Sequence, residues 1–174
     1  HYHNESSLGQ VLEHLPETIP FTGDLGISFR DVCKGTHGID DFIAQLTPEE
    51  LNALCKGEGQ MDSPLGTRGN AGMLGGTTQS LRDKGLPTLT TTDGPSGIRV
   101  CCYTALLPCG TALASSWDVK AVEALGHLFG QEMVRKGSDI LLGPGLNIHR
   151  DPLCGRNFEY YSEDPLLSGT VAAA

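Results

Sequence analysis

The sequence predicts an α/β fold in which neighbouring strands are parallel. Residues 87–92 are short and β-branched, as in a strand, and residues 117–136 repeat apolar side chains at helical spacing. Residues 139–142 form a second short apolar run. A strand, a helix and a strand in this order favour parallel pairing through a right-handed crossover.

The N-terminal part of the chain has a different character. Residues 1–38 lack sustained periodicity, and Pro16 and Pro20 interrupt helical segments, so we expect an arm or interdomain linker. One short helix is expected over residues 8–15, where apolar side chains share a face. Residues 39–174 then form the expected domain.

The start of that domain is predicted to be helical. Residues 39–46 have an amphipathic pattern, and Thr47 followed by Pro48 is typical of the start of a helix, here expected over residues 48–56. The glycine-rich residues 57–80 lack the strand and the Lys-Ser/Thr pair of a phosphate-binding loop, so a flexible connection is expected.

The long helix and the helix after it have recognisable ends. Ser116 is a candidate N-cap of the helix over residues 117–136, and Gly137 is the expected C-terminal cap. Asp164 and Pro165 are typical of an N-cap and first position, so another helix is expected after them.

Charge and hydropathy argue against two classes of partner. The formal net charge is −9 with only 12 Lys and Arg, whereas nucleic-acid binding depends on clustered cations. No apolar run approaches the roughly 20 residues that span a bilayer, and no export signal is visible. We therefore expect neither a nucleic-acid nor a membrane partner, and a cytoplasmic location.

The cysteines are predicted to be reduced thiols. Their spacing is irregular and includes no paired Cys-x-x-Cys, which argues against a disulfide framework and a structural zinc site. We expect no metal and no cofactor. The six cysteines are Cys33, Cys55, Cys101, Cys102, Cys109 and Cys154.

Asp93 is the first candidate for chemistry. It lies at the end of the strand over residues 87–92, and Gly94 and Pro95 force a turn directly after it. A carboxylate at a strand end on a rigid support suits a binding site. An Asx-turn explains the same residues equally well.

Arg156 is the second candidate. A guanidinium presents several donors in a fixed fork, which suits adjacent sugar hydroxyls or a carboxylate. The alternative is a structural ion pair with Glu159. Tyr160 and Tyr161 could stack on a ligand or pack in the core.

Two carboxylates flanking a bond are what a glycosidase requires, and Asp93 with Glu159 is a possible pair. Their spacing along the chain does not decide whether they face each other.

Two long motifs resemble those of one family. The segments DGPSGIR (residues 93–99) and GPGLNIHRDPLCGRNFEYYSEDP (residues 143–165) closely resemble the β-glucosidase branch of glycoside hydrolase family 3. The resemblance covers roughly residues 40–174 and implies the first part of a (β/α)8 TIM-barrel-like domain. Residues 1–38 resemble the connector of members with inverted domain order.

The resemblance assigns roles to individual residues. It implies that Asp93 and Arg156 bind sugar hydroxyls in the glycone subsite and that Arg99 lies near the same pocket. Glu159 is then a supporting residue and not a catalytic carboxylate, and His149 also supports the site by shaping its loop.

The resemblance also implies what this chain lacks. The family's nucleophile and general acid/base match no segment here, so we expect a piece of a longer β-glucosidase that is inactive without the remainder of the same enzyme. The expected substrate is a β-glucoside or small oligosaccharide. A β-xylosidase and a non-catalytic sugar-binding module are the alternatives.

Overall fold

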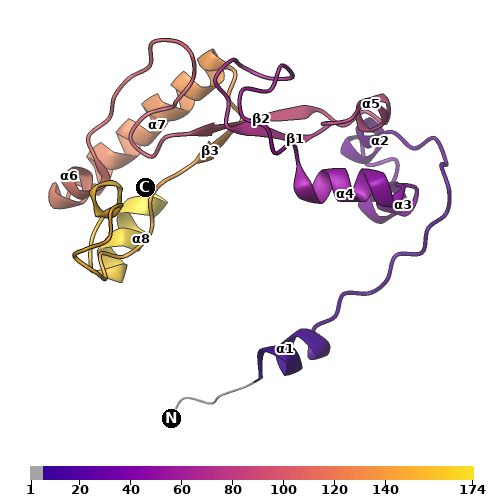
Figure 1. Cartoon of the computed structure of the whole chain (residues 1–174), viewed down its shortest axis with the longest axis horizontal. Coiled ribbons are helices and arrows are strands. Elements are labelled where there is room, and N and C mark those ends of the chain that lie inside the picture. The colour runs from indigo at the N-terminus through magenta and orange to yellow at the C-terminus, as the bar shows by residue number, and fades with distance from the viewer. Residues whose placement is uncertain (1–5) are drawn as a thin grey trace. The chain divides into compact units, whose positions relative to one another are not determined.

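The computed structural model describes residues 6–174 and divides into two units, one up to Pro48 and one from Glu49 to Ala174 (Figure 1). The first five residues of the predicted arm lie outside the described residues. Among the residues described, no helix combines the length and apolar character needed to cross a membrane.

The described part of the first unit contains three short helices, α1 (Ser7–Glu13), α2 (Phe29–Cys33) and α3 (Ile39–Ala44). Helices α1 and α3 confirm the two helices expected here, each ending two residues before its predicted limit. Phe29 and Phe42 meet edge to face with ring centroids 5.6 Å apart. The buried Gln45 side chain binds the backbone of Ile27 through both its amide oxygen and its nitrogen, which fixes the extended segment between α1 and α2.

The second unit is built on a three-stranded sheet of order β1-β2-β3, with strands β1 (Gly72–Gly75), β2 (Thr88–Asp93) and β3 (Ile140–Leu142). Strand β1 is antiparallel to β2, and β2 is parallel to β3. The predicted parallel pairing is therefore confirmed. The Asp139 carboxylate accepts a hydrogen bond from the Thr90 amide at 2.8 Å, which fixes the register where β3 begins.

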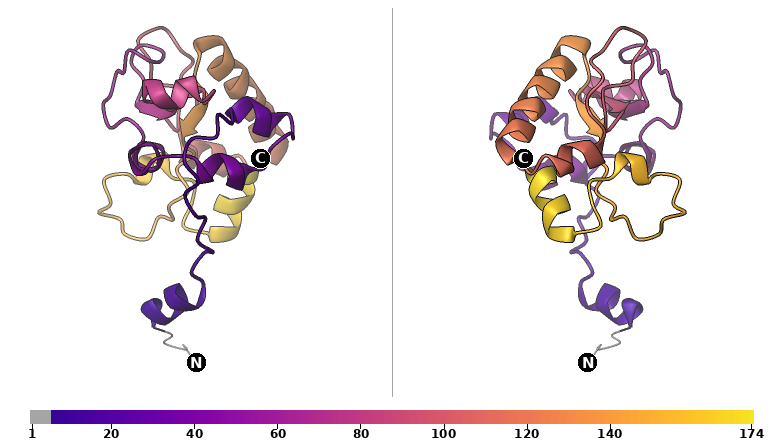
Figure 2. Two further views of the ribbon diagram at one scale, coloured as in Figure 1. Left: turned by 90° about the vertical axis from the view of Figure 1, so that its right-hand side faces the viewer. Right: turned by 90° about the vertical axis from the view of Figure 1, so that its left-hand side faces the viewer.

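The second unit also contains five α-helices. Helices α7 and α8 pack against each other close to the C-terminus (Figure 2). The helices are α4 (Pro48–Lys56), α5 (Gln79–Asp83), α6 (Gly110–Ser115), α7 (Val119–Lys136) and α8 (Pro165–Ala173). Helices α4, α7 and α8 match the predictions, whereas α6 was not predicted.

The expectation of an unstructured connection over residues 57–80 was wrong. This segment contains β1 and α5, and Met73 of β1 is buried against the sheet. Two of the four residues of β1 are glycines, so the strand depends on backbone pairing with β2 and carries little propensity of its own. Helix α5 is tied to α4 because Glu50 binds Lys84 at 2.8 Å and Ser80.

The start of α7 also differs from the prediction. Asp118, not Ser116, is the N-cap, and its carboxylate accepts a hydrogen bond from the Ala121 amide at 3.0 Å. Ser116 instead ends α6. The predicted ends at Gly137 and Asp164 are confirmed, because Gly137 has φ 69° and the Asp164 side chain accepts from Leu166.

Candidate functional site

The turn after β2 holds Asp93 in place. Asp93 is the last residue of β2 and lies opposite Leu142 of β3, so it sits at the carboxyl end of two parallel strands. Gly94 has φ 126°, and a Cβ there would lie 1.7 Å from the Gly97 carbonyl oxygen. Only glycine fits this turn, which returns the chain so that the Arg99 amide donates to the Asp93 carbonyl at 2.9 Å.

The same turn pairs two of the predicted site residues. The Arg99 guanidinium forms an ion pair with Asp93 Oδ2, while the Arg99 side chain stays 73% exposed and that of Asp93 36% exposed. Within residues 6–174, no donor reaches the second oxygen, Oδ1. The Asp93 carboxylate is thus oriented by Arg99 and can still accept hydrogen bonds from a ligand. This geometry favours a binding role for Asp93 over the alternative of a purely local Asx-turn.

The loop between β3 and α8 is organised by His149. Its ring Nε2 lies 2.8 Å from the Asn157 carbonyl oxygen and 3.2 Å from that of Tyr160. These two carbonyls flank a short 3-10 helix, η1 (Asn157–Glu159). An Nε2–H tautomer can donate to both, so His149 fixes the turn that carries the neighbouring charged residues.

That turn brings Arg156 and Glu159 together. Arg156 Nε donates to Glu159 Oε1, and this hydrogen bond, followed by the Coulombic attraction of Glu159, raises the pKa of Arg156. The Glu159 side chain is nearly buried, whereas the Arg156 side chain is 70% exposed. The ion pair with Glu159, which was the alternative role for Arg156, is therefore present, and it holds Nε while most of the Arg156 side chain remains exposed.

One cleft of about 310 Å3 joins the two predicted motifs. Arg99 from the first motif and Glu159 from the second both line it. Asp93 and Arg156 do not line this cleft, but each is bonded to a residue that does. The two carboxylates that could have formed a glycosidase pair are each paired with an arginine instead.

Several lining residues were missed by the sequence analysis, and two of them are exposed apolar side chains. Leu106 and Phe158 are 89% and 66% exposed and form an apolar edge of the cleft. Phe158 lies inside the second motif, beside Glu159, and could have been noticed there. Leu106 follows no pattern that would have identified it. Tyr160 and Tyr161 are buried, which decides for packing over stacking on a ligand.

All six cysteines are exposed, and no two of them are joined by a disulfide bond in the structure. In the described part of the chain, no group of three His, Cys, Asp or Glu side chains could hold a metal ion.

The fold and these two motifs define a class of carbohydrate-processing enzymes. Residues 46–174 match the model of the glycosyl hydrolase family 3 N-terminal domain. The chain belongs to glycoside hydrolase family 3.

Individual relatives agree with this membership. The chain is 47% identical over 165 residues to a β-glucosidase of Ruminococcus albus, with 94% of this chain and 17% of that protein covered. The structure of a β-glucosidase from Paenibacillus barengoltzii matches with a TM-score of 0.88 at 48% identity, covering 94% of this chain and 18% of that one. β-Glucosidase 3B of Thermotoga neapolitana in complex with glucose matches with a TM-score of 0.67 at 39% identity, covering 78% and 20%.

These matches confirm the predicted fold. The N-terminal domain of these relatives is TIM-barrel-like, and the strands and helices of residues 46–174 form part of such a domain. The chain spans less than a fifth of the length of the Ruminococcus albus relative.

Proposed function

We propose that this chain forms one wall of the glycone-binding site of a retaining β-glucosidase. The observation that carries the proposal is the pairing of the two motifs: Asp93 with Arg99 and Arg156 with Glu159, joined through one cleft at the carboxyl ends of parallel strands. In barrels of this type, active sites form at that end. The β-glucosidase names of the relatives and the glucose complex of one of them support a β-glucoside as substrate.

Each paired residue then has a defined task. The Asp93 carboxylate accepts hydrogen bonds from sugar hydroxyls, and the ion pair with Arg99 keeps it oriented. The terminal nitrogens of the largely exposed Arg156 side chain donate to neighbouring hydroxyls, while Glu159 holds the guanidinium plane through Nε. His149 acts indirectly by fixing the backbone turn.

The chemistry of bond cleavage is assigned to the rest of the enzyme. Retention requires a carboxylate nucleophile and a separate acid about 5 Å away from it. The family resemblance matches neither group to a segment of this chain, and Asp93 and Glu159 are each bound to an arginine. The residues of this chain contribute by hydrogen bonds that tighten as the sugar approaches its oxocarbenium-like state.

The segment before residue 39 is proposed to connect this domain to another part of the same enzyme. The family model begins only at residue 46, yet the match to the Ruminococcus albus protein covers 94% of the chain. Some relatives therefore share the arm as well as the barrel segment.

A chimera tests the proposed function. Residues 46–174 replace the matching segment of the Ruminococcus albus β-glucosidase, and kcat/KM is measured on aryl β-glucoside and aryl β-xyloside. We expect hydrolysis with a preference for the glucoside. A folded chimera that preferred the xyloside, or hydrolysed neither, would contradict the proposal.

A further inference from the structure

One loop, residues 96–107, provides most of the residues that line the polar cleft, and it is called the cleft loop below. The Leu107 amide donates to the Ser96 carbonyl at 2.8 Å and closes the loop at its base. The cleft loop also carries Arg99, whose guanidinium pairs with Asp93. Its position therefore governs both the shape of the cleft and the orientation of the Asp93 carboxylate.

The cleft loop has little apolar packing to hold it in place. Within residues 96–107 only Ile98 is buried, whereas Tyr103 is 99% exposed and Leu106 is 89% exposed. Burial of apolar surface is the main source of stability in a fold, and most of this loop does not share in it. Its position must therefore depend on hydrogen bonds to neighbouring segments.

Helix α7 supplies two such bonds, each with a charged side chain. The Glu132 carboxylate accepts from the Ala105 amide through both oxygens, at 3.0 and 3.2 Å. One helical turn later on the same face, the Lys136 ammonium donates to the Tyr103 carbonyl at 2.8 Å. Hydrogen bonds to charged groups are stronger than neutral ones. A long, regular helix thus holds the cleft loop at two points two residues apart.

The part of the cleft loop held by α7 is connected to Arg99. The Thr104 hydroxyl donates at 2.9 Å to the carbonyl of Ile98, the residue directly before Arg99. The loop has another attachment on the other side of Arg99, where the Cys101 amide donates to the Arg68 carbonyl at 2.9 Å. A displacement of the part held by α7 would therefore alter Arg99 while the loop stays attached to the domain.

The geometry points to a role for the two charged side chains of α7, and we propose that Glu132 and Lys136 are positioning residues of the glycone site. They hold the cleft loop where Arg99 pairs with Asp93. Neither belongs to the described residues that line the cleft, so they act through the backbone of the loop. This inference rests on the proposed function, because it takes Asp93 to bind the glycone.

Substitutions of Glu132 in the chimera described above test this role. Glu132→Ala removes both acceptor oxygens, whereas Glu132→Gln keeps one for the Ala105 amide. We expect kcat/KM on an aryl β-glucoside to fall about tenfold for alanine and about threefold or less for glutamine. The melting temperature should stay within about 2 °C of wild type, because exposed polar contacts contribute little to stability. Lys136→Met should act in the same direction as Glu132→Ala, and Lys136→Arg should restore most of the loss.

The same helix offers matched controls. Glu123 and Lys120 also lie on α7, both are exposed, and they are nine and sixteen residues before Glu132 and Lys136, so they occupy the other side of the helix. Glu123→Ala and Lys120→Met remove the same charges without touching the cleft loop, and kcat/KM should stay near wild type. An equal loss at these positions would overturn the positioning role, as would wild-type kcat/KM in Glu132→Ala.

Hydrogen exchange of the amides of residues 102–106 tests the same role without activity. Exchange should be several times faster in Glu132→Ala than in the wild-type chimera, and close to wild type in Glu132→Gln and Glu123→Ala. A wild-type chimera that hydrolysed neither glycoside would contradict the proposed function, and the exchange rates would still show whether Glu132 holds the loop. Unchanged exchange in Glu132→Ala overturns the inference whatever the activity.

Discussion

At the residue scale, the site depends on two charged pairs whose members are not equivalent. In each pair one member is better shielded, Asp93 or Glu159, and the arginine is mostly exposed. Exposed ion pairs contribute little to stability, so their value lies in orientation. Substitutions here should therefore change catalysis far more than folding.

Asp93→Ala should lower kcat/KM on an aryl β-glucoside by about 100-fold or more, because each lost charged hydrogen bond to a hydroxyl weakens transition-state binding by roughly tenfold or more. The measurement uses the chimera, with its melting temperature recorded alongside. Arg99 loses its partner but is already 73% exposed, so stability should change little. Near-normal turnover would remove Asp93 from the glycone site.

Arg156→Lys should lower kcat/KM about tenfold or more, because an ammonium cannot hold Glu159 through Nε and present a planar fork to the sugar at once. Arg150→Lys, in the same loop and also exposed, is the matched control and should stay near wild type. Equal effects of the two substitutions would reassign Arg156 to a structural role.

At the scale of single elements, the N-cap of α7 can be tested directly. Asp118→Ala should reduce the free energy of unfolding by about 1 kcal/mol, because the Ala121 amide loses its acceptor at the helix start. Urea unfolding of the 174-residue chain measures this loss. Ser116→Ala, which removes the residue first expected to be the cap, should cost less. The reverse order would restore Ser116 as the functional cap.

The elements also show where sequence patterns suffice. Helix α7 and strand β2 were predictable because periodicity and β-branching are local properties, and cap chemistry marks the end of α7 at Gly137 and the start of α8 at Asp164. Strand β1 was not, because a GMLG segment is a strand only through its pairing with β2. The choice between Ser116 and Asp118 was likewise undecidable, since both residue types cap helices.

Some features of the candidate site were also predictable from the sequence, and others were not. The positions of Asp93, Arg156 and Glu159 at strand and loop ends were predictable from motifs, and the Arg156–Glu159 pair followed from its spacing of three. The Asp93–Arg99 pair and the contribution of Leu106 to the cleft depend on how the chain returns after the Gly94 turn, which residue types alone do not specify.

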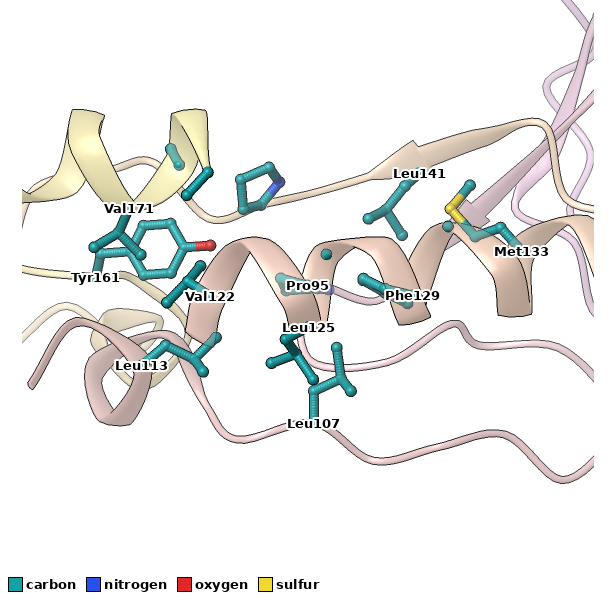
Figure 3. Close-up of a pocket in the computed structure, with 15 residues that line it drawn as sticks. Pro95, Leu107, Leu113, Val122, Leu125, Phe129, Met133, Leu141, Tyr161 and Val171 are labelled. Atoms are coloured by element: carbon teal, nitrogen blue, oxygen red, sulfur yellow. The ribbon is translucent and has the colours of Figure 1, made fainter. Parts of the chain in front are cut away.

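At the scale of the whole molecule, one small apolar cluster links three helices of the second unit, α6, α7 and α8. Its buried members are Ala114 of α6, Val122 of α7, Val171 of α8, and Tyr161 from the loop before α8. Tyr161 follows the polar loop that carries Arg156, and it also lines an apolar hollow beside α7 and α8 (Figure 3).

Tyr161 also makes the stability of the chain sensitive to alkaline pH. Burial raises the pKa of the Tyr161 phenol above its ordinary value near 10. Below that ordinary value both folded and unfolded states keep the proton, and the contribution is constant. Above it the unfolded chain loses its proton first, so the free energy of unfolding falls as pH rises toward the pKa of the folded state.

Tyr161→Phe should remove the part of this fall that is due to the phenol. Urea unfolding of both proteins between about pH 8 and pH 11 measures it, and the wild-type protein should lose more stability over that range than the variant. Parallel curves for the two proteins would mean that the Tyr161 phenol ionises as readily in the folded cluster as in the unfolded chain.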